Sequence, residues 1–173
     1  MSSDNGHHRV SDMTTATLSL EISYSQVSVF AAGLVNPFND WTDQHVAQGF
    51  SWRPESVSFL TLDDAGTLVV DVERGTAFDT AGSPAPRIIR VPFTVPESGR
   101  VEVASISSSA SLQIAPGGYE LTFEHGRDEG GMWCKLHFKP TDDGLAAAIL
   151  RADDQLHAGD ELLMEAEPAV PDK

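Results

Sequence analysis

The stretch TLSLEISY, from Thr17 to Tyr24, alternates apolar and polar side chains one by one. One face of this stretch carries the apolar side chains of Leu18, Leu20, Ile22 and Tyr24. Because successive side chains of a β-strand point to opposite faces, this pattern predicts a strand with one buried face and one face in solvent.

The same period of two recurs through most of the chain. It is found at Val27/Val29, Val57/Phe59, Leu68/Val70/Val72, Ile89/Val91/Phe93/Val95, Val101/Val103, Leu112/Ile114 and Tyr119/Leu121/Phe123. Short strands that follow one another every ~8–12 residues are typical of an antiparallel β-sandwich. The glycine-containing turns at 63–66 and 96–99 further predict that consecutive strands pair as hairpins.

A different pattern, NDWTDQHVAQGFSW, runs from Asn39 to Trp52. It predicts a short α-helix over 41–48, with Asp40 as the N-terminal cap and Gly49 in the left-handed position after the last turn. The predicted fold is therefore all-β, a single antiparallel β-sandwich with one short α-helix near residues 41–48.

The ends of the chain are polar and look unlike the rest. We expect residues 1–16 to form a flexible N-terminal tail, residues 17–166 to form the β-sandwich domain, and residues 167–173 to form a flexible C-terminal tail. The polar start lacks the order of a secretory signal, and no apolar run approaches the ~20 residues that cross a bilayer. These features predict a cytoplasmic protein without membrane insertion.

The single cysteine, Cys134, lies in an apolar strand pattern and is expected to be a buried thiol.

The net charge is the strongest bulk signal. The chain has 26 acidic and 11 basic residues, for a formal net charge of −15. A field of this sign repels the phosphates of nucleic acid and of anionic membranes, and it attracts cationic protein surfaces. We therefore expect no direct binding to nucleic acid. On composition alone, however, solubility explains the acidity better than a binding function does.

Metal binding and catalysis are poorly supported by the residue patterns. Asp40, Asp43 and His45 are all metal-ligand types, but residues two apart on a helix point in different directions, and no further ligand is close in sequence. No motif of a hydrolase, kinase or metalloprotease is present. We therefore predict a protein that is not an enzyme and has no cofactor. A hydrolase that uses His125 or His137 with a carboxylate is kept as an alternative.

Several motifs occur in an informative order. They are LSLEISYSQVSVF from Leu18, DWTD from Asp40, QGF from Gln48, RVPFTV from Arg90, VEVASI from Val101 and PGGYELT from Pro116. In this order the chain resembles the competence protein J (ComJ, also called Nin) family, whose founding member inhibits the DNA-entry nuclease NucA. The resemblance covers roughly residues 17 to 124, about two-thirds of the chain.

The resemblance implies a small acidic protein that binds a DNA nuclease and blocks its activity, in a competence-related or an immunity-type role. Acidity then has a purpose, because a negative surface can mimic DNA in the basic groove of a nuclease. The predicted partner-binding residues are Asp40, Trp41 and Asp43, followed by the acidic pairs Asp63, Asp64, Asp153 and Asp154. A tryptophan at the start of a short helix more often packs inward than contacts a partner, so the alternative for Trp41 is a cover for the rim of the sandwich.

One further alternative comes from a different class of protein. A β-sandwich that binds a small molecule or a carbohydrate would use exposed tryptophans, such as Trp41 and Trp52, to stack on its ligand. This alternative predicts a concave aromatic pocket with converging polar groups, and the nuclease inhibitor predicts a broad acidic face.

Overall fold

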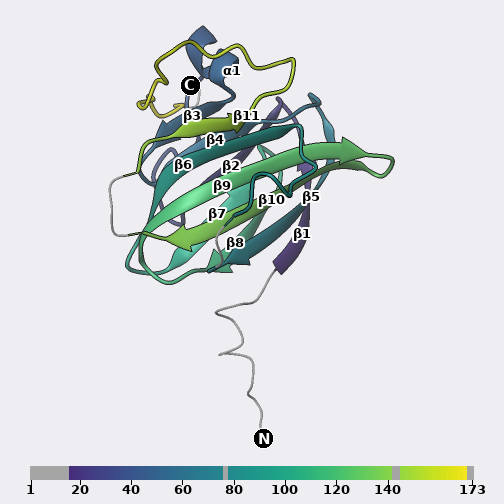
Figure 1. The fold of residues 1–173 in the computed structure, drawn as a ribbon. Coiled ribbons are helices and arrows are strands. Elements are labelled where there is room, and N and C mark those ends of the chain that lie inside the picture. Colours follow the sequence, from purple (N-terminus) through teal and green to yellow (C-terminus); the bar gives the residue numbers. More distant parts are fainter. Residues whose placement is uncertain (1–15, 76–77, 142–144, 171–173) are drawn as a thin grey trace, which may run out of the picture.

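The computed structural model describes residues 16–75, 78–141 and 145–170, and these form two β-sheets packed face to face, with one short helix at one end (Figure 1). The all-β sandwich predicted from the sequence is confirmed. Residues 1–15 and 171–173, which the sequence assigned to flexible tails, lie outside the described residues.

One sheet has six strands in the order β1-β5-β10-β9-β6-β11. Their bounds are β1 Ala16–Ile22, β5 Gly66–Arg74, β6 Arg87–Val95, β9 Gly117–Asp128, β10 Gly131–Pro140 and β11 Ala148–Arg151. Neighbouring strands are antiparallel except for β5 and β10, which run parallel. Because parallel strands cannot be joined by a tight turn, a long connection separates β5 from β10, and it contains four further strands, of which β6 and β9 belong to this sheet.

The second sheet has five strands in the order β3-β4-β2-β7-β8, all antiparallel. Their bounds are β2 Gln26–Ala31, β3 Phe50–Arg53, β4 Ser56–Leu60, β7 Arg100–Ala104 and β8 Ser109–Gln113. The helix α1, Asp43–Gln48, precedes β3.

The core lies between the inner faces of the two sheets, where apolar side chains from alternate strand positions meet. Phe59 of β4 stacks on Phe123 of β9 with ring centroids 4.3 Å apart, so one aromatic pair links the two sheets. The thiol of Cys134 is buried on β10, as the sequence predicted, and burial raises its pKa far above the ordinary value. This thiol is therefore protonated and unreactive at neutral pH.

The apolar face predicted for the first strand is correct for Leu20 and Ile22, which are buried, but wrong for Tyr24. The strand ends at Ile22, and Tyr24 lies in the following turn with 77% of its surface exposed. Period-two alternation holds only while the backbone stays extended, and the turn rotates the tyrosine out into solvent.

The prediction that consecutive strands pair as hairpins is only partly correct. The pairs β3–β4, β7–β8 and β9–β10 are hairpins. By contrast, the turns at 63–66 and 96–99 each join strands that belong to different sheets. Turn residues allow the chain to reverse, but they do not determine whether the next strand pairs with the last one or crosses to the facing sheet.

The helix forms where it was predicted, but its cap is different. Thr42, not Asp40, is the N-cap: its hydroxyl accepts the His45 N–H, and the Thr42 N–H donates to His45 Nδ1 in return. Asp40 is held outside the helix because its N–H donates to the Glu167 carbonyl at 2.8 Å. A long-range backbone contact thus overrides the local preference of aspartate for a cap.

Gly49 ends the helix with φ +87°, as predicted for a left-handed position. A Cβ at this position would lie 2.8 Å from Leu156 Cδ2, whereas a Cβ at Gly33, which has the same φ, would meet nothing within 4 Å.

We therefore expect Gly49→Ala to lower the free energy of unfolding by about 2 kcal/mol and Gly33→Ala by about 1 kcal/mol, since both substitutions strain the backbone but only the first creates a clash. Urea unfolding followed by circular dichroism measures both values. Equal losses in the two variants would show that Leu156 moves aside at no cost.

Candidate functional site

The helix α1 stands at one end of the sandwich, and the C-terminal segment, residues 152–170, lies against it (Figure 1). Gln48, which is buried, holds this segment through its side-chain amide: Nε2 donates to the Leu163 carbonyl at 3.0 Å, and Oε1 accepts the Leu163 N–H at 2.8 Å. His45 Nδ1 accepts the Thr42 N–H, so the ring proton is on Nε2, which donates to the Glu165 carbonyl at 2.9 Å. These contacts fix the backbone of the segment, in which Leu156 is buried while Asp160, Glu161, Glu165 and Glu167 are exposed.

Residues 167–169, which the sequence assigned to a flexible tail, bond to the chain before α1. The Ala169 N–H donates to the Phe38 carbonyl at 2.8 Å, and Asn39 and Pro168 form an isolated β-bridge. The C-terminal segment thus closes over the loop that leads into the helix.

The three leading site residues lie at the start of α1. Asp40 and Asp43 are exposed. Trp41 is partly buried, and its Nε1 donates to Gln26 Oε1 of β2 at 3.2 Å. The tryptophan therefore covers the rim of the sandwich between α1 and β2, and the two carboxylates beside it are available to a partner.

Asp63 and Asp64 lie in the turn between β4 and β5, at the same end of the sandwich. Asp63 forms an ion pair with Arg127 at 3.2 Å, with both side chains about half exposed. Asp64 is exposed, and its carboxylate accepts a hydrogen bond from the Ser25 hydroxyl at 2.8 Å.

Asp153 and Asp154 are neighbours in sequence but differ in their surroundings. Asp153 binds the fully buried guanidinium of Arg87 through both carboxylate oxygens, at 3.0 and 2.9 Å, so its charge is used within the fold. Asp154 is exposed. Both line an open cavity of about 320 Å³, together with Leu62, Pro86, Arg127 and Gln155.

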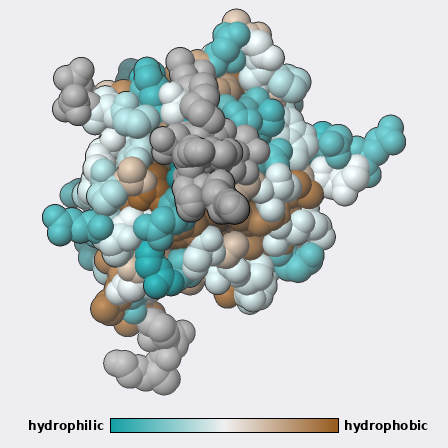
Figure 2. Space-filling view, turned by 90° about the horizontal axis from the view of Figure 1, so that it is seen from below, coloured by the Kyte–Doolittle hydropathy of each residue, from teal (hydrophilic) through white to brown (hydrophobic). Residues whose placement is uncertain are grey.

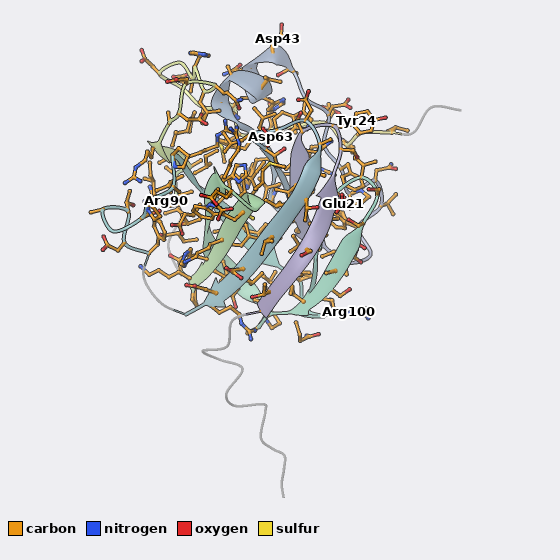
Figure 3. All side chains as sticks on the ribbon, turned by 90° about the vertical axis from the view of Figure 1, so that its right-hand side faces the viewer. Glu21, Tyr24, Asp43, Asp63, Arg90 and Arg100 are labelled. Atoms are coloured by element: carbon orange, nitrogen blue, oxygen red, sulfur yellow. The ribbon has the colours of Figure 1, made fainter. Side chains whose placement is uncertain are left out.

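These positions belong to one surface, which we call the α1 end: residues 23–25, 38–49, 61–65, 127–130 and 152–170. Arg127 is the one arginine or lysine among these residues. Their twelve carboxylates are those of Asp40, Asp43, Asp63, Asp64, Asp128, Glu129, Asp153, Asp154, Asp160, Glu161, Glu165 and Glu167. With twelve acids and one arginine, the α1 end has a formal net charge of −11, compared with −15 for the whole chain. In Figure 3, Asp43, Asp63 and Tyr24 are labelled at this end and Arg100 at the opposite one.

Six of these acids were missed as site residues from the sequence: Asp160, Glu161, Glu165 and Glu167 follow Gly159 without any motif, and Asp128 and Glu129 lie where the chain turns from β9 into β10. The enrichment of acids after Thr141 was the available signal. It did not show that this part of the chain folds back onto α1.

The histidines named in the hydrolase alternative are placed inside the fold. His125 is fully buried; its Nε2 accepts the Leu62 N–H at 3.0 Å, and its Nδ1 donates to the Trp133 carbonyl at 2.8 Å. His137 lies on β10 with its ring nitrogens 3.4 Å from Glu73 and 3.5 Å from Glu124, and it is 9% exposed. Within residues 16–75, 78–141 and 145–170, no group of three or more histidine, cysteine, aspartate or glutamate side chains is arranged to hold a metal ion.

No tryptophan lines any of four cavities formed by described residues, whereas the alternative of a small-molecule or carbohydrate-binding protein requires an aromatic pocket. Trp52 is partly buried against the core, and its Nε1 donates to the Pro92 carbonyl at 2.7 Å. The stacking surface that this alternative requires is therefore not formed by Trp41 or Trp52.

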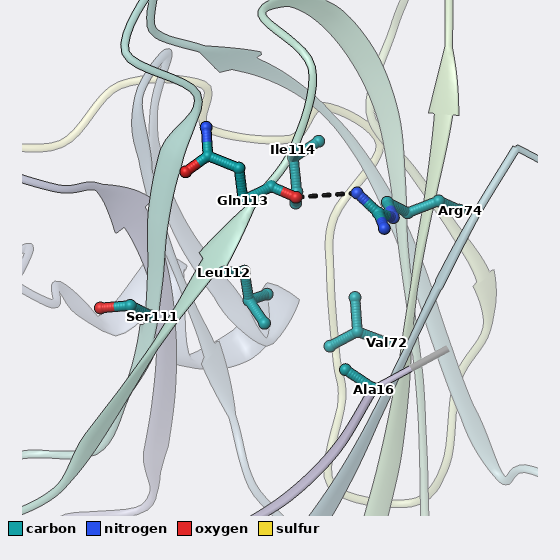
Figure 4. A pocket seen from close by; sticks show the side chains of 7 residues that line it. All are labelled: Ala16, Val72, Arg74, Ser111, Leu112, Gln113 and Ile114. Atoms are coloured by element: carbon teal, nitrogen blue, oxygen red, sulfur yellow. Dashed lines mark hydrogen bonds between the residues drawn. The ribbon is translucent and has the colours of Figure 1, made fainter. Parts of the chain in front are cut away.

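One of these cavities, of about 320 Å³, lies between the sheets near the start of β1. It is lined mainly by apolar side chains, among them Val72, Leu112 and Ile114, and Arg74 crosses its edge to donate to the Gln113 carbonyl at 2.7 Å (Figure 4). Seen from this end, away from α1, the surface mixes hydrophilic and hydrophobic residues (Figure 2).

Among the described residues, none of the helices has the length and apolar composition needed to cross a membrane.

Comparison with known proteins gives a consistent result. The model of the family Competence protein J (ComJ) matches residues 19–139. A DNA-entry nuclease inhibitor of Bacillus subtilis (strain 168) is 31% identical over 104 residues, which are 60% of this chain and 76% of the relative. The crystal structure of ComJ from Bacillus subtilis, an inhibitor of the DNA degrading activity of NucA, superposes with a TM-score of 0.66 at 21% identity, over 75% of this chain and 98% of that one. The resemblance recognised in the sequence is thereby confirmed, and the chain belongs to the competence protein J family.

Proposed function

We propose that this protein inhibits a DNA nuclease by covering the basic active-site surface of the nuclease with its α1 end. The observation that carries the proposal is the charge of this surface, which holds twelve carboxylates and one arginine; two of the carboxylates, those of Asp63 and Asp153, are paired with arginines. A nuclease must present cationic groups to the phosphodiester backbone, and a rigid surface of opposite charge competes with DNA for them. The similarity to a DNA-entry nuclease inhibitor supports the same activity.

The proposed inhibition is steric and electrostatic, and it involves no turnover of any substrate. Two features support this. The thiol of Cys134 is buried, and both ring nitrogens of His125 are engaged by backbone groups. In this proposal the protein acts in the cytoplasm, and its partner is a nuclease of the DNA-entry type or a toxin nuclease.

The proposal is tested by titrating the full-length protein into a DNA digest. The nucleases are the DNA-entry nuclease of Bacillus subtilis and a nuclease encoded in the same genome as this chain. We expect cleavage to stop at stoichiometric amounts of inhibitor and the inhibition to weaken as salt is raised from 50 to about 300 mM, because salt screens exposed charges. Full cleavage at a large molar excess of the protein in both digests would refute the proposed function.

Within this proposal we expect Asp40→Asn/Asp43→Asn to weaken inhibition about ten-fold, which corresponds to about 1.4 kcal/mol of binding free energy. Thr42, and not Asp40, caps α1, so the double substitution removes charge without removing the cap. The inhibition constant is measured together with the urea midpoint of each variant.

The matched control is Glu97→Gln/Glu102→Gln, which removes the same formal charge from the turn between β6 and β7 and from β7. It should leave the inhibition constant within two-fold of the wild type. If both double variants lose inhibition equally, total charge matters and the α1 end does not.

A further inference from the structure

Tyr24 is the most exposed aromatic side chain among the described residues of the α1 end, with 77% of its surface in solvent. It occupies the turn where the chain leaves β1 in one sheet and enters β2 in the other. In Figure 3 it projects from the same end as Asp43 and Asp63.

The backbone at Tyr24 is in a conformation that this residue rarely adopts. Both Tyr24 and Ser25 have φ +59°, in the left-handed region where glycine and asparagine are preferred and where bulky side chains carry strain. Strained residues persist where the surrounding structure holds them, and they occur preferentially at sites that contact ligands or partners.

The neighbouring turn holds this conformation in place through Ser25. The Ser25 N–H donates to the Asp64 carbonyl at 3.1 Å, the Ser25 hydroxyl donates to the Asp64 carboxylate at 2.8 Å, and the Thr61 N–H donates to the Ser25 carbonyl at 2.9 Å. The tyrosine ring is therefore presented to solvent from a turn fixed by three hydrogen bonds.

The groups around Tyr24 indicate which kind of partner side chain its ring contacts. Asp64 adjoins the turn on one side, and on the other side Gln26 accepts a hydrogen bond from Trp41 at the start of α1. A tyrosine ring attracts cations to its face, and carboxylates beside it strengthen the attraction. Interfaces between proteins are commonly held by a tyrosine or tryptophan anchor inside a ring of polar contacts.

We propose that Tyr24 is the aromatic anchor of the inhibitor, and that its ring packs on an arginine or lysine side chain at the basic surface of the nuclease. This inference rests on the proposed function and adds a residue to it. The strain at Tyr24 is then part of recognition, because it aims the ring outward before the partner arrives and so reduces the entropy lost on binding.

The decisive variant is Tyr24→Gly, assayed in the full-length protein against a nuclease that the wild type inhibits. Glycine adopts φ +59° without strain, so we expect the thermal midpoint to be unchanged or raised, while the inhibition constant rises at least about ten-fold. Loss of inhibition together with equal or greater stability cannot result from unfolding. Inhibition by Tyr24→Gly equal to that by the wild type would overturn the inference and leave the proposed function intact.

Two further variants distinguish the effect of the aromatic ring from the effect of backbone conformation, and a third variant serves as a control. Tyr24→Phe keeps the ring and should stay within three-fold of the wild type. Tyr24→Asn keeps a side chain that suits the left-handed region and should lose as much inhibition as Tyr24→Gly; if it inhibits normally, backbone freedom and not the ring explains the glycine result. Val35→Ala trims an exposed apolar residue, 79% in solvent, outside the α1 end and should have no effect. If the wild type itself inhibits neither nuclease, the proposed function fails and the anchor fails with it.

Discussion

Replacing Arg87 with methionine should lower the free energy of unfolding by about 3–5 kcal/mol. The guanidinium of Arg87 is fully buried, and it donates to both carboxylate oxygens of Asp153, to Gln155 Oε1 and to the Leu60 carbonyl. Burial lowers the pKa of Arg87, and the bond to Asp153 opposes that shift. The variant leaves the Asp153 carboxylate, whose side chain is 13% exposed, without its counter-charge.

An ion pair of the same residue types, but exposed at the surface, provides the control. Arg127 pairs with Asp63 at 3.2 Å, with side chains 49% and 45% exposed, so Arg127→Met should cost less than about 1 kcal/mol. Urea unfolding of the two variants measures the difference between them. A similar cost for both would mean that the Asp153 carboxylate finds water or another donor when Arg87 is removed.

The second large effect concerns pH. Burial lowers the pKa of His125 from its ordinary value of 6.5 to about 4, against the opposing hydrogen bond to the Trp133 carbonyl. Between these two values the unfolded chain binds a proton at this histidine and the folded chain does not. The contribution of His125 to the free energy of unfolding therefore has its full value above about pH 6.5. It decreases as the pH is lowered, by about 3 kcal/mol between pH 7 and 4.

Two measurements test this pH dependence. The imidazole resonances of His125 should show a neutral ring down to about pH 5, and its Nε2 should remain the acceptor for the Leu62 N–H. Over the same pH range, the free energy of unfolding should decrease less for His125→Gln than for the wild type. The carboxylates and the other histidines contribute equally to both proteins, so the difference between the two curves isolates His125. A ring that titrates near pH 6.5 in the folded protein would contradict the prediction.

Particular residues show what the sequence could and could not predict. Alternation at Leu20 and Ile22 predicted the first strand because one face of a sandwich strand must be apolar. Gly49 predicted the end of the helix because a left-handed residue is needed there. Tyr24 was misplaced by the same alternation, because nothing in the local sequence shows that the strand ends two residues earlier. Local rules thus identified the elements but not where each one stops.

The candidate site was harder to predict because it depends on distant contacts. Asp153 looked like an exposed acid beside Asp154, but it pairs with Arg87, 66 residues away in the chain. Asp40 was predicted to be the helix cap, but its N–H donates to the Glu167 carbonyl, and this contact holds it outside the helix. The acids lie together at one end because the C-terminal segment packs against α1. No short sequence pattern predicts this long-range contact. The partner-binding role of the seven predicted residues remains a prediction for the variants above to test.

The closure of the C-terminal segment over α1 has a consequence for biosynthesis. Residues 38–49 obtain their bonding partners from Leu163, Glu165, Glu167 and Ala169. During translation these partners emerge from the ribosome more than a hundred residues after the helix that they cover. The sheets therefore have most of their strands available well before the α1 end is assembled, and a nascent chain that stalls before residue 169 carries a sandwich without its finished acidic surface.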